Sequence, residues 1–304
     1  MNDSVQQRVR AGSFGAWVMA LRPATLPAAI APVALGCAIA AAEDGFQTLP
    51  AAAALVGALL LQVLANLSND LFDCEKGADT AERLGPTRVV QSGLLTPRAV
   101  RTSVLVTVAL SIAVGAYLTA VAGLPIVVIG TASILAALAY TGGPYPLGYN
   151  GLGEIFVIVF FGFVAVCGTT YVQLGRVPAL AFWAAIPPGF LAAAVLVVNN
   201  VRDLETDVRA GKRTLAVRWG RRAALVEYAV LLGGAYLAVV LVAVTGLVGW
   251  EALAPLVTLP SAIQLCRRVL RETGRVLNRR LVGTAQLMLV FALLFAGGIL
   301  LGAR

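Results

Sequence analysis

The sequence predicts an all-α polytopic membrane protein, with about nine transmembrane helices arranged as two four-helix parallel repeats and a ninth helix around a central cavity. Composition is the first observation behind this prediction: the 304 residues are 59% hydrophobic and 12% charged, with a mean hydropathy of +0.87. A soluble domain typically carries about 25% charged residues, so the composition excludes one. The other two observations are nine apolar runs and a pair of matched acidic motifs.

The apolar runs are each roughly 20 residues long, the length that spans a bilayer as a helix. They cover residues 24–42, 49–70, 99–121, 124–141, 152–174, 178–201, 223–246, 250–266 and 281–303. Turn-rich or charged segments separate them, and no long polar segment of soluble-domain composition lies between them. We therefore expect one transmembrane domain over residues 1–304, embedded in a lipid bilayer.

The basic residues predict the orientation of this domain. Of the 23 Lys and Arg residues, 21 lie in alternate loops, and the opposite loops hold only Arg176 and Arg304. Cytoplasmic loops are enriched in Lys and Arg, so the N-terminus and the long polar loops near residues 73–98 and 202–222 are predicted to be cytoplasmic, in the cell membrane. The net charge of +8 is thus a loop property and does not predict a nucleic-acid partner.

The residue inventory excludes several kinds of chemistry. The chain contains no histidine, which rules out a histidine base and imidazole-ligated haem or zinc. Its four cysteines lie far apart, form no CxxC pair and are interpreted as apolar filler. They are Cys37, Cys74, Cys167 and Cys266.

Two acidic motifs end the second and sixth apolar runs. Each has an Asn four residues before an Asp and a second Asp three or four residues later, so helical spacing puts the three side chains on one face. The motif residues are Asn66, Asp70 and Asp73 in the first copy and Asn199, Asp203 and Asp207 in the second. Because both runs are even-numbered, the halves at about residues 20–145 and 150–275 are predicted to run in the same direction, with a site between them.

Carboxylates stacked at a membrane boundary repel one another and favour a bound cation. Oxygen ligands from Asp and Asn suit Mg²⁺, which also binds phosphate oxygens. Basic residues follow each motif and complete a clamp for a diphosphate. They are Lys76, Arg83 and Arg88 in the first copy and Lys212 and Arg213 in the second. The alternative is that the acidic residues only cap helix ends, which two matched copies disfavour.

Further segments accompany the motifs and together cover nearly the whole chain. They are Arg22-Pro23-Ala24-Thr25-Leu26-Pro27, Gly77-Ala78-Asp79 with Arg83-Leu84-Gly85-Pro86, Tyr140-Thr141-Gly142-Gly143-Pro144, Gly151-Leu152-Gly153-Glu154, and Gly211-Lys212-Arg213-Thr214-Leu215-Ala216-Val217-Arg218. With these segments the chain resembles the UbiA superfamily of intramembrane aromatic prenyltransferases. Within it, the chain is most similar to the enzymes that prenylate 1,4-dihydroxy-2-naphthoate in menaquinone biosynthesis.

The resemblance implies a Mg²⁺-dependent transfer of a polyprenyl group from polyprenyl diphosphate to that aromatic acid, with decarboxylation, giving demethylmenaquinone. It implies that Asp70, Asp73, Asp203 and Asp207 are the catalytic, metal-binding residues. The substrate-binding residues implied are Asn66, Asn69, Lys76, Arg22, Tyr140, Asn199, Arg202 and Lys212. The chain departs from the family in the loop after the fourth helix, since no Lys or Arg lies between Arg101 and Arg176.

Two alternatives stay open at this point. One is a related transferase with another acceptor, such as 4-hydroxybenzoate or homogentisate. The other is a secondary transporter, which is disfavoured because every acidic residue falls near a predicted helix end or in a loop. Neither prenyl chain length nor oligomeric state is predicted.

Overall fold

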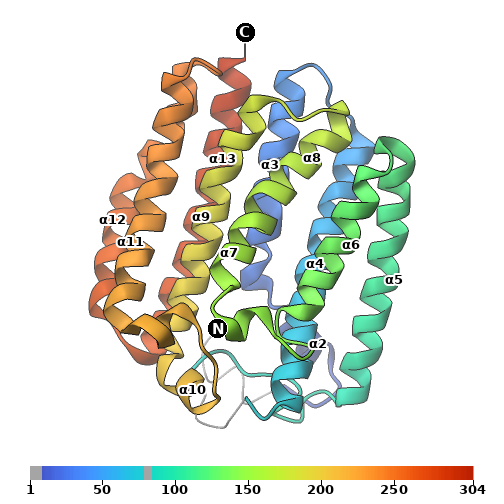
Figure 1. The fold of residues 1–304 in the computed structure, drawn as a ribbon, viewed down its shortest axis with the longest axis vertical. Helices are drawn as coiled ribbons and strands as arrows, with labels where there is room; N and C mark the ends of the chain where they lie inside the picture. The colour runs from blue at the N-terminus through green and yellow to red at the C-terminus, as the bar shows by residue number, and fades with distance from the viewer. Residues whose placement is uncertain (1–8, 79–83, 304) are drawn as a thin grey trace.

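The chain folds into an elongated bundle of helices. The computed structural model describes residues 9–78 and 84–303, and within those ranges every regular element is a helix. The long helices run nearly parallel, with α2 at the lower end of Figure 1 and the C-terminus at the upper end. The predicted all-α fold is confirmed.

Each of the nine predicted apolar runs contains a helix. In chain order these are α3 (Pro27–Ala42), α4 (Thr48–Glu75), α5 (Pro97–Ala122), α6 (Pro125–Ala139), the continuous α7 (Gly153–Val157), η3 (Ile158–Val164) and α8 (Ala165–Leu174), α9 (Ala179–Arg202), α11 (Leu215–Val244), η4 (Trp250–Thr258) with α12 (Leu259–Arg271), and α13 (Leu277–Gly302). Short elements lie among them: α2 (Phe14–Leu21), η1 (Pro23–Thr25), η2 (Leu147–Asn150), α10 (Leu204–Arg209) and η5 (Gly274–Val276).

Six of these helical segments are long and apolar enough to cross a membrane: α4, α5, α7 to α8, α9, α11 and η5 with α13. A bent pair, Phe14–Thr25 and Pro27–Ala42, makes a seventh with an angle of 51°. The remaining two runs differ, because α6 has 15 residues and η4 is a 3₁₀ helix. The protein is a multi-pass membrane protein by this measure, and nine crossings stay a prediction.

Local sequence signals start and break the helices near the lower end. The Thr96 hydroxyl accepts from Ala99 N–H at 3.2 Å, and Pro97 supplies the fixed φ that suits a first helical residue. Thr214 caps α11 in the same way, accepting from Val217 N–H at 3.3 Å. Gly220 interrupts that helix with a φ of 80°, which glycine adopts without steric penalty.

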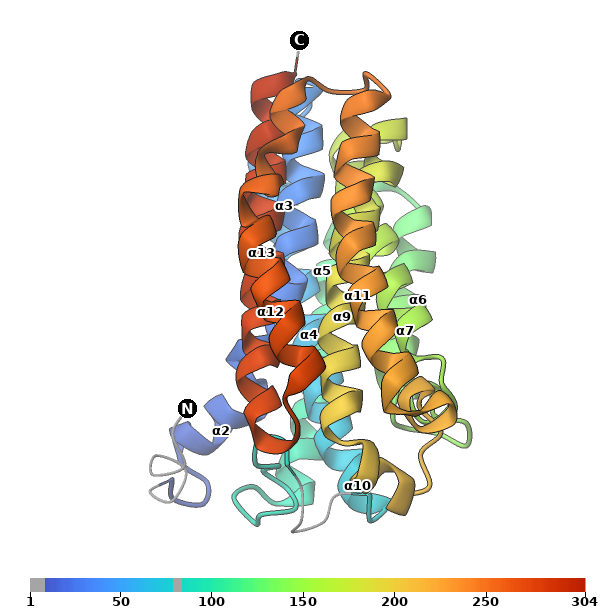
Figure 2. The same cartoon turned by 90° about the vertical axis from the view of Figure 1, so that its left-hand side faces the viewer.

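The helices form two packed groups with a cavity between them. α9, α11 and α13 pack with α3 around the larger apolar core, while α4 and α5 pack with α2 around a smaller one. Figure 1 shows α11 to α13 on one side of the bundle and α4 to α6 on the other. In Figure 2, viewed from the side of α11 to α13, α4 and α5 lie behind them. Both α4 and α9 end at the lower end, so the two acidic motifs meet there.

Glycines allow the central helices to approach closely. A Cβ on Gly162 would lie 2.6 Å from the carbonyl oxygen of Ala185 and 3.0 Å from Cα of Gly189, so α9 and the π-helical η3 touch through their backbones. Pro187 and Pro188 lie between these two contacting residues and remove two N–H donors from α9. The contact fixes α9 against the wall of the cavity.

Gly162→Ala should destabilise the protein by about 1–3 kcal/mol, because the added methyl group overlaps a backbone that has no room to move. Gly233→Ala is the matched control, since a Cβ added there would have no atom of the described residues within 4 Å. Thermal unfolding in detergent measures both. Equal melting temperatures would mean that this helix contact contributes nothing.

Candidate active site

A deep cavity of about 430 Å³ lies between the two groups of helices. Both acidic motifs line its lower end, and its walls then become apolar toward the other end of the bundle. The apolar lining includes Leu61, Val114, Leu118, Ile126, Ile129, Phe156 and Phe160. A ligand with an anionic head and a long apolar tail matches this division.

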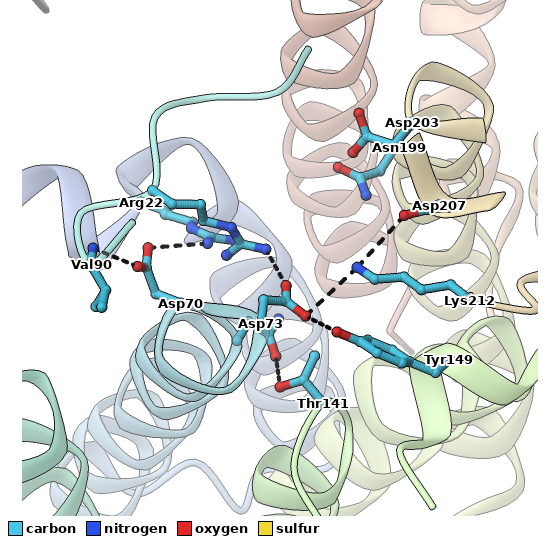
Figure 3. Close-up of polar contacts among 12 residues, drawn as sticks. Arg22, Asp70, Asp73, Val90, Thr141, Tyr149, Asn199, Asp203, Asp207 and Lys212 are labelled. Carbon is cyan, nitrogen blue, oxygen red and sulfur yellow. Dashed lines mark hydrogen bonds and ion pairs between the residues drawn. The ribbon is translucent and has the colours of Figure 1, made fainter. Parts of the chain in front are cut away.

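Asp70 is buried behind the cavity wall. Its two carboxylate oxygens accept hydrogen bonds from the backbone N–H groups of Val89 and Val90 at 3.2 and 3.0 Å. The guanidinium of Arg22 lies 3.6 Å from the same carboxylate, as Figure 3 shows. Asp70 therefore ties the loop segment after α4 to the end of α4, and it is not among the cavity-lining residues.

Asp73 faces the cavity and collects three partners from different segments. Arg88 forms an ion pair with it at 2.7 Å. The hydroxyl of Tyr149 donates to its other oxygen at 2.5 Å, as Figure 3 shows. Nζ of Lys212 lies 3.6 Å from that second oxygen. A carboxylate only 1% exposed needs such compensation, because an unpaired buried charge is strongly destabilising.

Lys212 links the two motifs. Its Nζ lies 3.6 Å from a carboxylate oxygen of Asp73 and 3.6 Å from one of Asp207. The same ammonium lies 4.6 Å from the centre of the Tyr149 ring, within cation–π range. One residue of each acidic motif, Asp73 and Asp207, thus lies beside the same ammonium group (Figure 3).

The second motif does not continue one helix, contrary to the expectation of a single helical face. α9 ends at Arg202, Asp203 occupies the junction with a φ of −95°, and α10 begins at Leu204. At this junction Arg202 binds the carboxylate of Asp203 through Nε at 2.8 Å and through Nη2. Asn199, Asp203 and Asp207 nevertheless line the same cavity.

Arg202 is placed behind this motif and not in the cavity lining. Its guanidinium donates to Oδ1 of Asn199 at 2.6 Å and to Oδ1 of Asn278 at 2.7 Å. Asn278 in turn donates to the carbonyl of Leu84 at 2.8 Å. Arg202 therefore orients Asn199 and Asp203 and anchors them to α13 and to the loop after α4.

The other predicted residues of the first half surround the cavity mouth. Asn66 lines the cavity and donates to the carbonyl of Leu21 and the hydroxyl of Thr25, both at 3.0 Å. Asn69 also lines it and accepts from the hydroxyl of Thr141 at 2.9 Å. These contacts hold the end of α2, η1 and the segment that follows α6 against α4.

Lys76 reaches the loop after α6, which has no basic residue of its own. Its Nζ donates to the carbonyl of Thr141 at 2.7 Å and to that of Gly143 at 3.3 Å. Desolvation lowers the pKa of Lys76. The charge of Asp73 acts to raise this pKa, and the charge of the neighbouring Lys212 lowers it further. Lys76 is outside the cavity lining. This lysine, which follows the first motif, therefore places a positive charge beside a loop that has no basic residue.

Tyr140 lies in the cavity wall directly after α6. Its carbonyl accepts from the N–H of Gly148 at 2.9 Å, which ties the following loop back to the end of the helix. A phenol ionises in water only near pH 10, so at neutral pH the hydroxyl keeps its proton. It is therefore available as a hydrogen-bond donor to a ligand.

Most of the predicted site residues come together around the cavity. The lining contains Arg22, Asn66, Asn69, Asp73, Tyr140, Asn199, Asp203, Asp207 and Lys212, together with Arg88. Asp70, Lys76 and Arg202 lie outside it, and Arg83 lies outside the described residues. Tyr149 was not predicted, because its role depends on a loop fold that brings residues 76 positions apart into contact.

The donor set suits Mg²⁺ shared with a ligand. Within residues 9–78 and 84–303, no three His, Cys, Asp or Glu side chains cluster closely enough to hold a metal by themselves. Mg²⁺ commonly takes one or two carboxylates and completes its shell with water and phosphate oxygens. Asp73 and Asp207, which already share one cation, supply oxygen donors of that kind.

Comparison with known proteins identifies the family. Residues 29–281 match the UbiA prenyltransferase family. The chain belongs to this family. A 1,4-dihydroxy-2-naphthoate octaprenyltransferase of Escherichia coli is 39% identical over 94% of this chain and 95% of its own length. One of Mycobacterium tuberculosis is 40% identical over 95% of this chain and 98% of its own length.

Solved structures of UbiA homologues share the fold. One from Archaeoglobus fulgidus, bound to DMAPP and Mg²⁺, aligns with a TM-score of 0.66 at 17% identity and covers 92% of this chain and 99% of its own. An apo structure of a homologue from Aeropyrum pernix aligns with a TM-score of 0.67 at 16% identity, covering 89% of this chain and 97% of its own. This UbiA prenyltransferase therefore has the helical architecture of its family.

In this UbiA enzyme, Tyr149→Phe should lower the kcat/KM for the prenyl donor by about tenfold or more, because it removes a hydrogen bond to the charged, buried Asp73. Tyr145→Phe is the matched control, since that side chain lies in the same loop and is 59% exposed. Steady-state prenyl transfer measures both. Equal values for the two variants would show that the Tyr149 hydroxyl has no role in transfer.

Proposed function

We propose that this chain transfers a polyprenyl group from polyprenyl diphosphate to 1,4-dihydroxy-2-naphthoate in the menaquinone pathway. The observation that carries the proposal is a cavity that joins two sets of carboxylates to an apolar interior. The choice of acceptor is supported by relatives at 36–40% identity over about 95% of the chain, each named a 1,4-dihydroxy-2-naphthoate octaprenyltransferase.

The proposed reaction balances without a strong base. The bond between the allylic carbon and the diphosphate oxygen breaks, and the ring carbon that carries the carboxylate bonds to the allylic carbon. The carboxylate then leaves as CO₂, and its bonding electron pair restores the aromatic ring. No ring proton is removed, which agrees with a chain that contains no histidine.

The residues at the lower end of the cavity would bind the anionic head of the donor. Arg22, Arg88 and Lys212 line the cavity and provide the cations, while Asp73, Asp203 and Asp207 would hold Mg²⁺. The bound metal would neutralise charge on the departing diphosphate. Asp70, predicted as a fourth ligand, accepts hydrogen bonds from the backbone N–H groups of Val89 and Val90. Because these residues directly follow Arg88, Asp70 would position Arg88.

We further propose nine membrane crossings, built from halves at about residues 20–145 and 150–275, with the lower end of Figure 1 cytoplasmic. The opposite placement of α2 and the C-terminus supports an odd number of crossings. The acid-lined mouth would then open toward the compartment where a soluble aromatic acid is made.

The decisive assay is prenyl transfer by the purified protein. With Mg²⁺, a set of allylic polyprenyl diphosphates and a panel of acceptors, the product of 1,4-dihydroxy-2-naphthoate should appear by mass, with loss of CO₂, and EDTA should abolish it. 4-Hydroxybenzoate and homogentisate serve as competing acceptors. Preference for either of these, or full turnover in metal-free buffer, would overturn the proposal.

Asp207 and Asp70 should differ in how their substitution changes the Mg²⁺ requirement. Asp207→Asn should raise the half-saturating Mg²⁺ concentration about tenfold or more and lower kcat about a hundredfold, because it removes a ligand charge beside the leaving group. Asp70→Asn, the matched control, should lower stability and leave that concentration nearly unchanged. A similar Mg²⁺ shift in both variants would make Asp70 a ligand as well.

Orientation can be tested by cysteine labelling in intact cells, starting from a variant in which the four native cysteines are replaced. A cysteine at the exposed Arg176 should react with an impermeant reagent, and one at the exposed Arg271 should react only after permeabilisation. The reverse pattern would mean that the protein is inverted.

A further inference from the structure

The segment Gly151-Leu152-Gly153-Glu154 has no part in the diphosphate clamp described above, yet its last residue is buried beside the cavity. Glu154 is 4% exposed, and its Oε1 accepts a hydrogen bond of 2.7 Å from Nδ2 of Asn200. Asn200 is 6% exposed and belongs to the cavity lining. A buried carboxylate therefore supports a side-chain amide that meets the cavity.

Glu154 differs from the carboxylates of the two motifs in its partners. Asp73, Asp203 and Asp207 each pair with Lys or Arg, whereas within residues 9–78 and 84–303 Glu154 forms no ion pair. A carboxylate accepts hydrogen bonds on both oxygens, so its presence fixes Nδ2 of Asn200 toward α7. The amide oxygen, Oδ1, is then the group of Asn200 left to accept from a ligand.

The same segment also shapes the position of Tyr140. A Cβ on Gly153 would lie 2.9 Å from the Tyr140 hydroxyl, and a Cβ on Gly148 would lie 2.8 Å from its ring. Both glycines therefore make room for the phenol against the start of α7. Tyr140 and Asn200 both line the cavity, and they meet the start of α7 at consecutive residues, Tyr140 at Gly153 and Asn200 at Glu154. The two side chains therefore define one corner of the cavity.

Apolar side chains complete this corner. Leu196 lies one helical turn before Asn200 on α9, and its Cδ2 lies 3.2 Å from the Cβ position of Gly153. Leu196 and Phe156 both line the cavity. A flat aromatic ring carrying hydroxyl groups fits such a corner, because it presents apolar faces and a polar edge.

We propose that Asn200 and Tyr140 form the subsite that recognises the ring hydroxyls of the aromatic acceptor, with Glu154 as the positioning residue for Asn200. This inference rests on the proposed function for its acceptor. One ring hydroxyl donates to Oδ1 of Asn200. This hydrogen bond increases the electron density of the ring, which must attack the allylic carbon. The Tyr140 hydroxyl donates to a hydroxyl oxygen of the same acceptor.

The first test measures binding in the absence of donor, by the intrinsic fluorescence of the naphthoates. The wild-type protein should bind 1,4-dihydroxy-2-naphthoate about tenfold more tightly than at least one of its two monohydroxy analogues, as expected for the loss of one buried hydrogen bond. Equal affinities for all three compounds would overturn the subsite. This result is independent of whether the protein transfers a prenyl group, so it does not depend on the transfer assay.

Variants test whether Asn200, Glu154 and Gly153 produce this difference in affinity. Asn200→Ala should reduce the affinity ratio between the dihydroxy acid and that analogue to about one. Glu154→Gln should reduce it severalfold, because a glutamine amide can also donate to Oδ1 and so no longer fixes the orientation of Asn200. Gly153→Ala should weaken acceptor binding by displacing Tyr140. The KM for the donor should stay nearly unchanged in Glu154→Gln.

Thr258→Val is the matched control, since it removes a buried hydrogen bond of 2.6 Å to Tyr236 and neither residue lines the cavity. It should keep the wild-type affinity ratio at a similar loss of melting temperature. If Asn200→Ala does not fold, the ratio in Glu154→Gln decides. An unchanged ratio in Glu154→Gln, or a donor KM raised as much as the acceptor dissociation constant, would refute the proposal.

Discussion

The structure depends on balancing carboxylates that are buried at one end of a membrane bundle. Asp70 and Asp73 are each 1% exposed and Asp203 is 4% exposed. Moving an ionised carboxylate out of water costs several kcal/mol, which only close partners recover. The partners of Asp73 come from three other segments: the segment after α4 supplies Arg88, the loop after α6 supplies Tyr149, and the segment after α10 supplies Lys212. The same charge balance that makes the site therefore also orders the loops around it.

Lys212 holds a special place in this balance because of its distances. It lies 3.6 Å from both Asp73 and Asp207, beyond hydrogen-bond length, whereas Arg88 and Arg202 bind their carboxylates directly. Turning toward a diphosphate would cost Lys212 only part of a Coulomb attraction, and metal bound between the same carboxylates would replace its charge. The arginines lose a directional hydrogen bond if they turn. Arg88 and Arg202 are thus held by directional hydrogen bonds, whereas Lys212 interacts with its two carboxylates over a longer distance.

Hydropathy and the repeated acidic spacing predicted the helical class and the convergence of the motifs, because both depend on local periodicity and on which end of the membrane a helix reaches. Three features lay beyond that information. α9 breaks at Asp203, Asp70 lies behind the wall against the backbone N–H groups of Val89 and Val90, and a loop path brings Tyr149 to Asp73. The last two are tertiary contacts without a spacing signal.

The position of Glu154 has a chemical consequence for a reaction that forms an allylic cation. A carboxylate exposed in the cavity would compete with the ring carbon and trap the cation as an ester. Asp73, Asp203 and Asp207 line the cavity, but each is engaged by a cation that reduces its nucleophilicity. Glu154 forms no ion pair among the described residues and lies behind Asn200, outside the lining. The amide presents a neutral oxygen to the cavity, so the acceptor is oriented without placing a second nucleophile beside the cation.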